Sequence, residues 1–179
     1  NSGAMWNGVK EATLTLEQGE KLLEIFKKDP HFEATLSRND IAYHAGIASY
    51  FTEKRDAVRA FREGLKSVSK ELMESGTLEK RQSVYHNRAQ EEVSLRLYAI
   101  NKWANDNNID LVIHIHFNDI PRSLRSPGRY SGFSIYIPES QLGNHRASRE
   151  LAESVHRELS KYFPRSDYPP EKDGLTEDQ

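Results

Sequence analysis

Apolar side chains recur with helical spacing in four stretches of this chain. In each of them a stripe of apolar residues runs among charged ones: residues 13–28, 53–75, 78–104 and 146–163. This period predicts four amphipathic helices. Because the second and third follow each other around Gly76, we expect residues 53–104 to form an antiparallel helical hairpin. Residues 40–52 carry aromatic side chains without a clear period, which indicates a loop or a short helix.

Strand-like alternation of apolar and polar residues appears in three shorter stretches. Residues 32–36 and 132–137 are short candidates. Residues 110–118 form a β-branched apolar run between turn residues, which is the pattern of a buried central strand. Side chains two residues apart lie on the same face of a strand. One face would therefore carry Leu111, Ile113, Ile115 and Phe117, and the other would carry Val112, His114, His116 and Asn118.

Strands and helices alternate over much of the chain, and this order indicates the fold class. It predicts an α/β fold with a mostly parallel or mixed sheet flanked by helices, into which the helical hairpin is inserted. A length of 179 residues suits a single domain, covering residues 1–179. Residues 1–10 are expected to form a loop, and no regular element is predicted from residue 164 onward.

The most suggestive polar side chains lie on the second face of the 110–118 stretch. His114, His116 and Asn118 would project together from the end of a strand, where open α/β sheets build their sites. Neutral imidazole is a good zinc ligand, so a metal site is one interpretation. The alternative is a pair of hydrogen-bonded core histidines, and the His-x-His spacing alone does not decide between the two. Glu11, just before the first predicted helix, is by itself an acid favoured by the helix dipole.

Composition removes several classes of function. With no cysteine, the chain has neither disulfides nor thiolate ligands, so a metal must be held by His, Asp or Glu. A formal net charge of -2 gives no basic excess, and no nucleic-acid partner is expected. No apolar run approaches the ~20 residues of a transmembrane helix. Neither a Gly-x-Ser-x-Gly elbow nor a P-loop is present.

Four segments, in this order along the chain, carry a family resemblance. The first is Gly8-Val9-Lys10-Glu11 ahead of a helix, and the second is Thr35-Leu36-Ser37-Arg38-Asn39-Asp40. The third and most specific runs from Leu95-Arg96 through Asn101 to residues 110–118, and the fourth joins Gly132 and Tyr136 to Ser148-Arg149-Glu150-Leu151-Ala152. Together they resemble the catalytic domain of zinc-dependent N-acetylmuramoyl-L-alanine amidases, the type 3 amidases.

The resemblance implies a cell-wall hydrolase. Such an enzyme uses Zn²⁺ to cut the amide bond between N-acetylmuramic acid and L-alanine in peptidoglycan, and it is secreted, periplasmic or cell-wall associated. Carried over by motif, Glu11 and His116 would be zinc ligands. His114 stands where the family usually has serine, so it would lie beside the metal or line the cleft, and Asn118 follows the ligand as in the family.

Two family features are missing from the 179 residues. The family's first zinc ligand is a histidine in a Gly-His-Gly-Gly type of turn, expected just before Asn1, and its catalytic glutamate is expected beyond Gln179. The resemblance therefore implies an incomplete catalytic domain that binds zinc weakly and hydrolyses poorly. Residues 53–90 exceed what a minimal member has, and they are interpreted as an insertion, either over the active-site face or as a longer surface hairpin. A non-catalytic wall-binding domain of the same fold and a zinc peptidase acting on other peptides are the alternatives.

Overall fold

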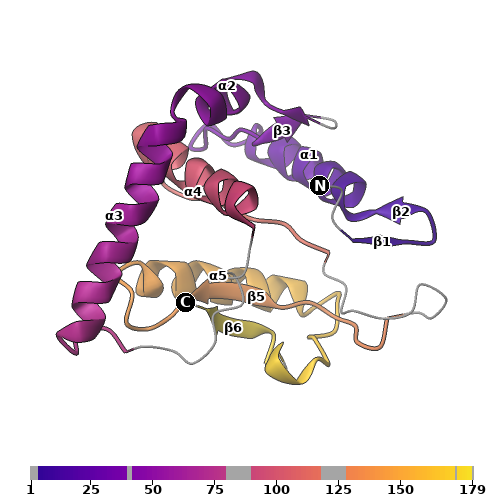
Figure 1. Ribbon diagram of the computed structural model, residues 1–179. Helices are drawn as coiled ribbons and strands as arrows, with labels where there is room; N and C mark the ends of the chain where they lie inside the picture. Colours follow the sequence, from indigo (N-terminus) through magenta and orange to yellow (C-terminus); the bar gives the residue numbers. More distant parts are fainter. Residues whose placement is uncertain (1–3, 40–41, 80–89, 118–127, 172, 179) are drawn as a thin grey trace. The chain divides into compact units, whose positions relative to one another are not determined.

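The computed structural model describes residues 4–39, 42–79, 90–117, 128–171 and 173–178 (Figure 1). The chain divides into two compact units. Unit 1 comprises residues 1–67 and 89–124, and unit 2 comprises residues 68–88 and 125–179. The single domain expected from the length stays a prediction.

Unit 1 is built mainly from helices. α1 spans Glu11–Phe26, α2 spans Ala45–Glu53, α3 spans Arg55–Glu74 and passes into unit 2, and α4 spans Glu91–Asp106. The helices predicted over residues 13–28 and 53–75 are confirmed, and the 40–52 stretch contains a short helix.

The third predicted helix begins later than residue 78. Leu78 and Glu79 are not helical, and α4 begins after Gln90, whose backbone is extended. Glu91 and Glu92 then occupy its first turn, where acids favour the positive end of the helix dipole. The apolar period placed the start of this helix too early, whereas the two glutamates mark where α4 begins.

Two short antiparallel hairpins precede and follow α1. β1 (Met5–Trp6) pairs with β2 (Val9–Lys10), and β3 (Arg38–Asn39) pairs with β4 (Ala42–Tyr43). The first hairpin turns at Asn7 and Gly8, which both have positive φ, as a two-residue Asn-Gly turn requires. The loop expected over residues 1–10 is therefore wrong for this part of the chain.

The stretch predicted as a buried central strand needs the main correction. Residues 111–117 take part in no strand pairing, and neither do residues 32–36, so both strand predictions are wrong. Ile113 is 50% exposed, and Leu111 and Phe117 are exposed as well. A strand is held by hydrogen bonds to a neighbouring strand, and the alternation of apolar residues does not specify that neighbour.

The core of unit 1 lies where α2, α3 and α4 meet. Its buried residues are Val58, Leu95 and Ala99, and the partly buried rings packed against them are Tyr50, Phe51 and Tyr98. Deleting such buried side chains typically costs several kcal/mol, so this small cluster is the main apolar support of the unit.

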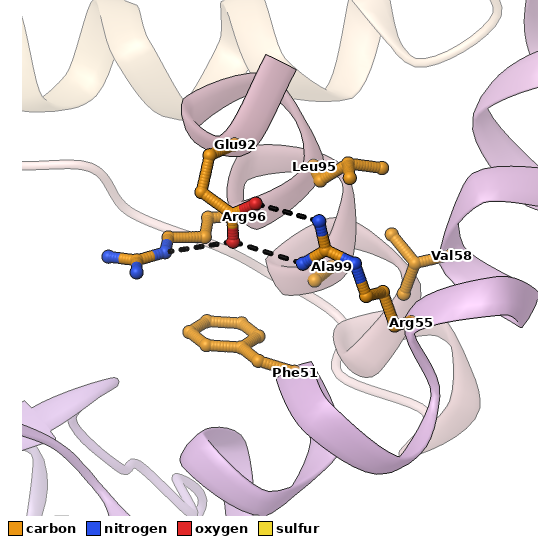
Figure 2. A pocket seen from close by; sticks show the side chains of 7 residues that line it. All are labelled: Phe51, Arg55, Val58, Glu92, Leu95, Arg96 and Ala99. Carbon is orange, nitrogen blue, oxygen red and sulfur yellow. Dashed lines mark hydrogen bonds and ion pairs between the residues drawn. The ribbon is translucent and has the colours of Figure 1, made fainter. Parts of the chain in front are cut away.

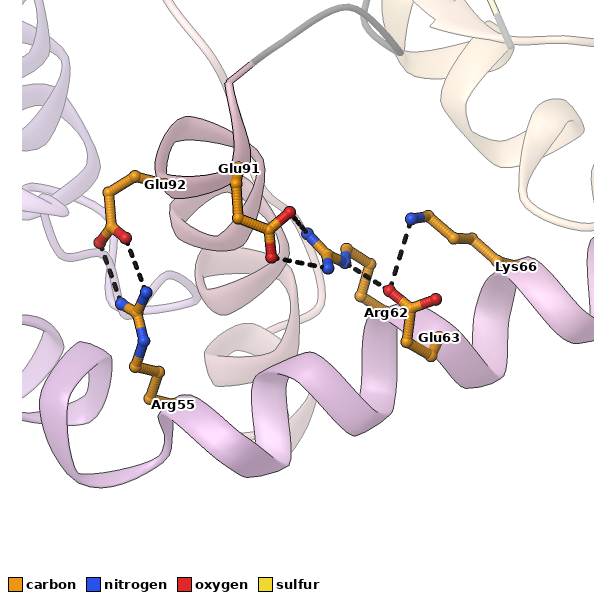
Figure 3. Close-up of polar contacts among 6 residues, drawn as sticks. All are labelled: Arg55, Arg62, Glu63, Lys66, Glu91 and Glu92. Atoms are coloured by element: carbon orange, nitrogen blue, oxygen red, sulfur yellow. Dashed lines mark hydrogen bonds and ion pairs between the residues drawn. The ribbon is translucent and has the colours of Figure 1, made fainter.

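Two ion pairs join α3 to α4 beside this core (Figure 3). Arg55 donates to both carboxylate oxygens of Glu92, and Arg62 donates to both oxygens of Glu91. The contacts lie near the N-terminal ends of both helices. Residues 80–89, which would connect a hairpin, lie outside the described residues, so the hairpin over 53–104 and the insertion over 53–90 stay predictions.

Unit 2 contains a parallel pair of strands and a long helix. β5 (Ile135–Pro138) pairs with β6 (Leu175–Asp178), and α5 (His145–Leu159) contacts both strands. The strand predicted over residues 132–137 and the helix predicted over residues 146–163 are thereby confirmed. β6 was not predicted, because its sequence is mostly polar. A short 3-10 helix, η2 (Pro169–Glu171), precedes β6.

These elements confirm the α/β class. Helices occur together with one parallel and two antiparallel strand pairs in the described part of the chain, so the pairing is mixed. None of the described helices is long and apolar enough to cross a membrane.

Candidate metal centre

Glu11 is fixed at the start of α1 by the strand before it. It is the first residue of the helix, and its backbone N–H donates to the carbonyl of Ala4 over 2.8 Å. The N–H of Ala4 in turn donates to Glu11 Oε2 over 2.9 Å. The Glu11 side chain is only 14% exposed. The β1–β2 hairpin therefore sets the direction of this carboxylate.

His116 approaches the other oxygen of the same carboxylate. Its Nδ1 lies 3.2 Å from Glu11 Oε1, and the backbone N–H of Phe117 donates to that oxygen, also over 3.2 Å. The imidazole itself is mostly exposed. Two residues 105 positions apart in the sequence are thus brought into direct contact.

The surroundings of Glu11 favour its ionised form. Partial burial alone would raise the pKa of this carboxyl group. Hydrogen bonds from the N–H groups of Ala4 and Phe117, and then the contact with His116, outweigh that burial, so the pKa of Glu11 lies below its usual value. An ionised carboxylate is the form that binds a metal cation.

His114 lies two residues before His116. Burial, and secondly the neighbouring charge of His116, lowers the pKa of His114, which favours a neutral imidazole. By accessible surface, however, His114 is an exposed residue, so the neighbouring atoms crowd its ring without excluding solvent. Asn118, the remaining residue that the resemblance implicates, lies outside the described residues.

Arg38 supports the site from β3. Its guanidinium donates to the carbonyl of Ala12 and, over 2.6 Å, to Thr15 Oγ1. Both acceptors lie in the first turns of α1, so Arg38 ties the beginning of that helix to the β3–β4 hairpin. In the sequence Arg38 was visible only as part of a family motif, and nothing in its local pattern indicated this contact.

The distance between Glu11 and His116 suits two ligands of one zinc ion. Tetrahedral zinc with bonds of about 2.0–2.1 Å places its ligand atoms about 3.3 Å apart. The observed separation between Nδ1 and Oε1 is 3.2 Å. Among the described residues, no group of three or more His, Cys, Asp or Glu side chains surrounds a common point. The described part of the chain thus offers two donors to a metal.

A separate cavity lies beside the core of unit 1 (Figure 2). Arg55 and Arg96 approach the carboxylate of Glu92 at its rim, and the rest of its wall is made by Phe51, Val58, Leu95 and Ala99. Its volume of about 20 Å³ has room for about one water molecule. This cavity is therefore too small for a peptide or a sugar.

Comparison with known proteins gives one match. The sequence model of a protein family described as N-acetylmuramoyl-L-alanine amidase matches residues 1–176. No curated protein and no solved structure matches the chain.

Proposed function

Because the chain belongs to the family of N-acetylmuramoyl-L-alanine amidases, we propose that it hydrolyses the amide bond between N-acetylmuramic acid and L-alanine in peptidoglycan, with zinc bound by Glu11 and His116. The observation that carries this proposal is the contact between Glu11 Oε1 and His116 Nδ1 at 3.2 Å. The family match alone supports an amidase acting on peptidoglycan, and the contact supports Glu11 and His116 as the proposed metal ligands.

The two residues suit zinc chemically. Carboxylate oxygen and imidazole nitrogen are both common zinc ligands, and catalytic zinc sites use three protein ligands with one open position. A bound zinc ion polarises a scissile carbonyl and lowers the pKa of water, which is the chemistry that amide hydrolysis needs.

The remaining roles are assigned to backbone and side-chain groups of this chain. The backbone N–H groups of Ala4 and Phe117 hold the Glu11 carboxylate ionised and oriented. From the family motif we assign His114 to the surroundings of the metal or the lining of the substrate cleft, and Asn118 to the substrate or the surroundings of the metal. We assign no catalytic acid or base within the chain. Because peptidoglycan lies outside the cytoplasm, we propose that the protein acts in the cell wall, the periplasm or the medium.

Zinc binding tests the two ligands directly. We expect Glu11→Gln and His116→Ala each to weaken zinc binding at least roughly 10- to 100-fold, measured by competition with a chromogenic chelator. His31→Ala is the matched control, since His31 also contacts a carboxylate, Asp29, but belongs to no proposed site. Equal zinc affinity in all four proteins would contradict the assignment.

The bond is tested on a defined muropeptide by mass spectrometry. Cleavage should release a peptide with a free L-alanine amino group, slowly in the zinc-loaded chain and more slowly in both ligand variants. Zinc-independent wall binding without cleavage would instead indicate a non-catalytic wall-binding domain. Cleavage of peptides that lack the muramoyl group would indicate a peptidase.

A further inference from the structure

Unit 2 holds three tyrosines that the proposed hydrolysis does not use. Tyr130 precedes β5, Tyr136 lies within it, and Tyr168 lies between α5 and β6. The ring centroids of Tyr130 and Tyr168 are 5.0 Å apart. The hydroxyl of Tyr136 donates to Glu171, three residues after Tyr168. We refer to Tyr130, Tyr136 and Tyr168 as the tyrosine ledge.

The backbone under the tyrosine ledge is firmly held. Four hydrogen bonds of 2.6–3.1 Å connect residues 131–133 to residues 164–167: Phe133 N to Pro164 O, Ser166 N to Phe133 O, Asp167 N to Ser131 O, and Ser131 N to Asp167 Oδ1. At Gly132 the two segments are so close that an added Cβ would lie 2.4 Å from the carbonyl oxygen of Arg165. The rings therefore have little backbone freedom to lose when a ligand binds.

Tyr136 lies on the strand face that α5 does not cover. Side chains alternate along a strand, so Ser134 and Tyr136 lie on the same face, and Ser134 Oγ is 2.9 Å from Thr176 Oγ1 of the paired strand. Phe133, on the opposite face, contacts the ring of His156 in α5. Because α5 covers that opposite face, Tyr136 remains 48% exposed. This face presents the Tyr136 ring together with the hydroxyl groups of Ser134 and Thr176.

Charges of both signs surround the ledge. The guanidinium of Arg129 lies 5.3 Å from the ring centroid of Tyr130. Two carboxylates accompany it: Asp167, which accepts from the N–H of Ser131, and Glu171, which accepts from Tyr136 and Ser166. This set of two carboxylates and one guanidinium has no excess of positive charge for a polyanion. It suits a neutral ligand with apolar faces for the rings and polar edges for hydroxyl and carboxylate groups.

From these contacts we propose that the tyrosine ledge binds a neutral chain of N-acetylated amino sugars. A pyranose ring has C–H faces that pack on aromatic rings, and its edge carries hydroxyl and acetamido groups that hydrogen-bond. The glycan strand of peptidoglycan has this chemistry, and naming it as the natural ligand rests on the proposed function. The ledge then holds the glycan, while Glu11 and His116 belong to the hydrolysis of the amide.

The test uses the tetrasaccharide of β-1,4-linked N-acetylglucosamine, which has no peptide and no scissile amide to L-alanine. Its affinity for the 179-residue chain is measured by isothermal titration calorimetry. We expect Tyr168→Ala and Tyr136→Ala each to weaken binding roughly 3- to 10-fold, and Tyr168→Phe to retain most of it because the ring remains. Tyr162→Ala is the matched control, since Tyr162 is 78% exposed and lies outside the ledge. Thermal unfolding of each variant shows whether it is folded, and Tyr130→Ala replaces any variant that is not.

Three results would contradict the proposal that the tyrosine ledge binds a glycan. They are no binding of the tetrasaccharide at millimolar concentration, equal affinity in wild type and the ledge variants, and an equal loss in Tyr162→Ala. Muropeptide cleavage is measured separately and distinguishes the two proposals. Cleavage without tetrasaccharide binding rejects only the ledge, whereas tetrasaccharide binding without zinc or cleavage rejects only the amidase mechanism.

Discussion

Two segments with similar strand patterns, one in each unit, differ in whether they pair with another strand. Residues 111–117 and β5 both alternate apolar residues between turns, yet only β5 is paired with another strand. The two segments also differ in the exposure of their isoleucines: Ile113 is 50% exposed, whereas Ile137 is 4% exposed. β5 has a parallel neighbour, β6, and a helix, α5, that covers one face. The local pattern favours extended backbone, but a strand forms only where a second strand, distant in the sequence, pairs with it.

The largest expected effect comes from shortening both isoleucines, which tests whether the two segments really differ in burial. Ile137→Ala should lower the free energy of unfolding by about 2–5 kcal/mol, because it leaves a cavity in a packed site. Ile113→Ala should change it by no more than about 0.5 kcal/mol, because the side chain is half in solvent. Urea unfolding of both variants measures the two values. Equal losses would mean that residues 111–117 are covered in solution as β5 is.

The same distinction explains how much of the fold was predictable. Helices form from contacts three and four residues apart, so the apolar stripes located α1, α3 and α5 within a few residues. β6 was missed because Thr176, Glu177 and Asp178 are polar, and its pairing with β5 depends on residues about 40 positions away. The local spacing of apolar and polar residues therefore does not predict which distant strands pair.

The candidate site, like the fold, could be predicted from the sequence only in part. The spacing placed His114 and His116 on one face, and the family motif singled out Glu11, but neither gave the contact between Glu11 and His116. That contact depends on backbone N–H groups of Ala4 and Phe117, which any residue type supplies. The role of Arg38 was hidden for the same reason, since one of its acceptors is the backbone carbonyl of Ala12.

A smaller effect tests how tightly unit 2 is joined beside β5. Gly132 has φ +99, and a Cβ there would lie 2.4 Å from the carbonyl oxygen of Arg165. Gly132→Ala should therefore destabilise the protein by about 1–3 kcal/mol in urea unfolding. Gly143→Ala is the matched control, because nothing lies within 4 Å of its added Cβ, and it should change stability by less than about 0.5 kcal/mol. A tolerated Gly132→Ala would show that these segments separate easily in solution.

The smallest expected effect is a difference in acid sensitivity between the units. Hydrogen bonds from Arg62 and Arg55 hold the pKa values of Glu91 and Glu92 below their usual 4.5, and Tyr50 and then Lys102 lower the pKa of Asp106. A carboxyl group with a lowered pKa in the folded state stabilises the fold above its usual pKa. That stabilisation is lost as the pH falls through the lowered value. All three groups lie in unit 1, whereas in unit 2 the side chain of Lys161 lowers the pKa of Glu158. Unit 1 thus has more carboxyl groups with a lowered pKa among the described residues, and it should weaken first below about pH 4.5.

Fluorescence reports on this difference, because both tryptophans, Trp6 and Trp103, belong to unit 1. Urea midpoints followed by tryptophan emission should fall as the pH drops below about 4.5, and they should fall less in a Glu91→Gln, Glu92→Gln double variant. Glu150→Gln is the control, because Glu150 pairs with Arg146 on the exposed surface of unit 2 and should leave the acid response of unit 1 unchanged. An acid response that is the same in the double variant would show that the pairs between α3 and α4 contribute nothing to holding these helices together.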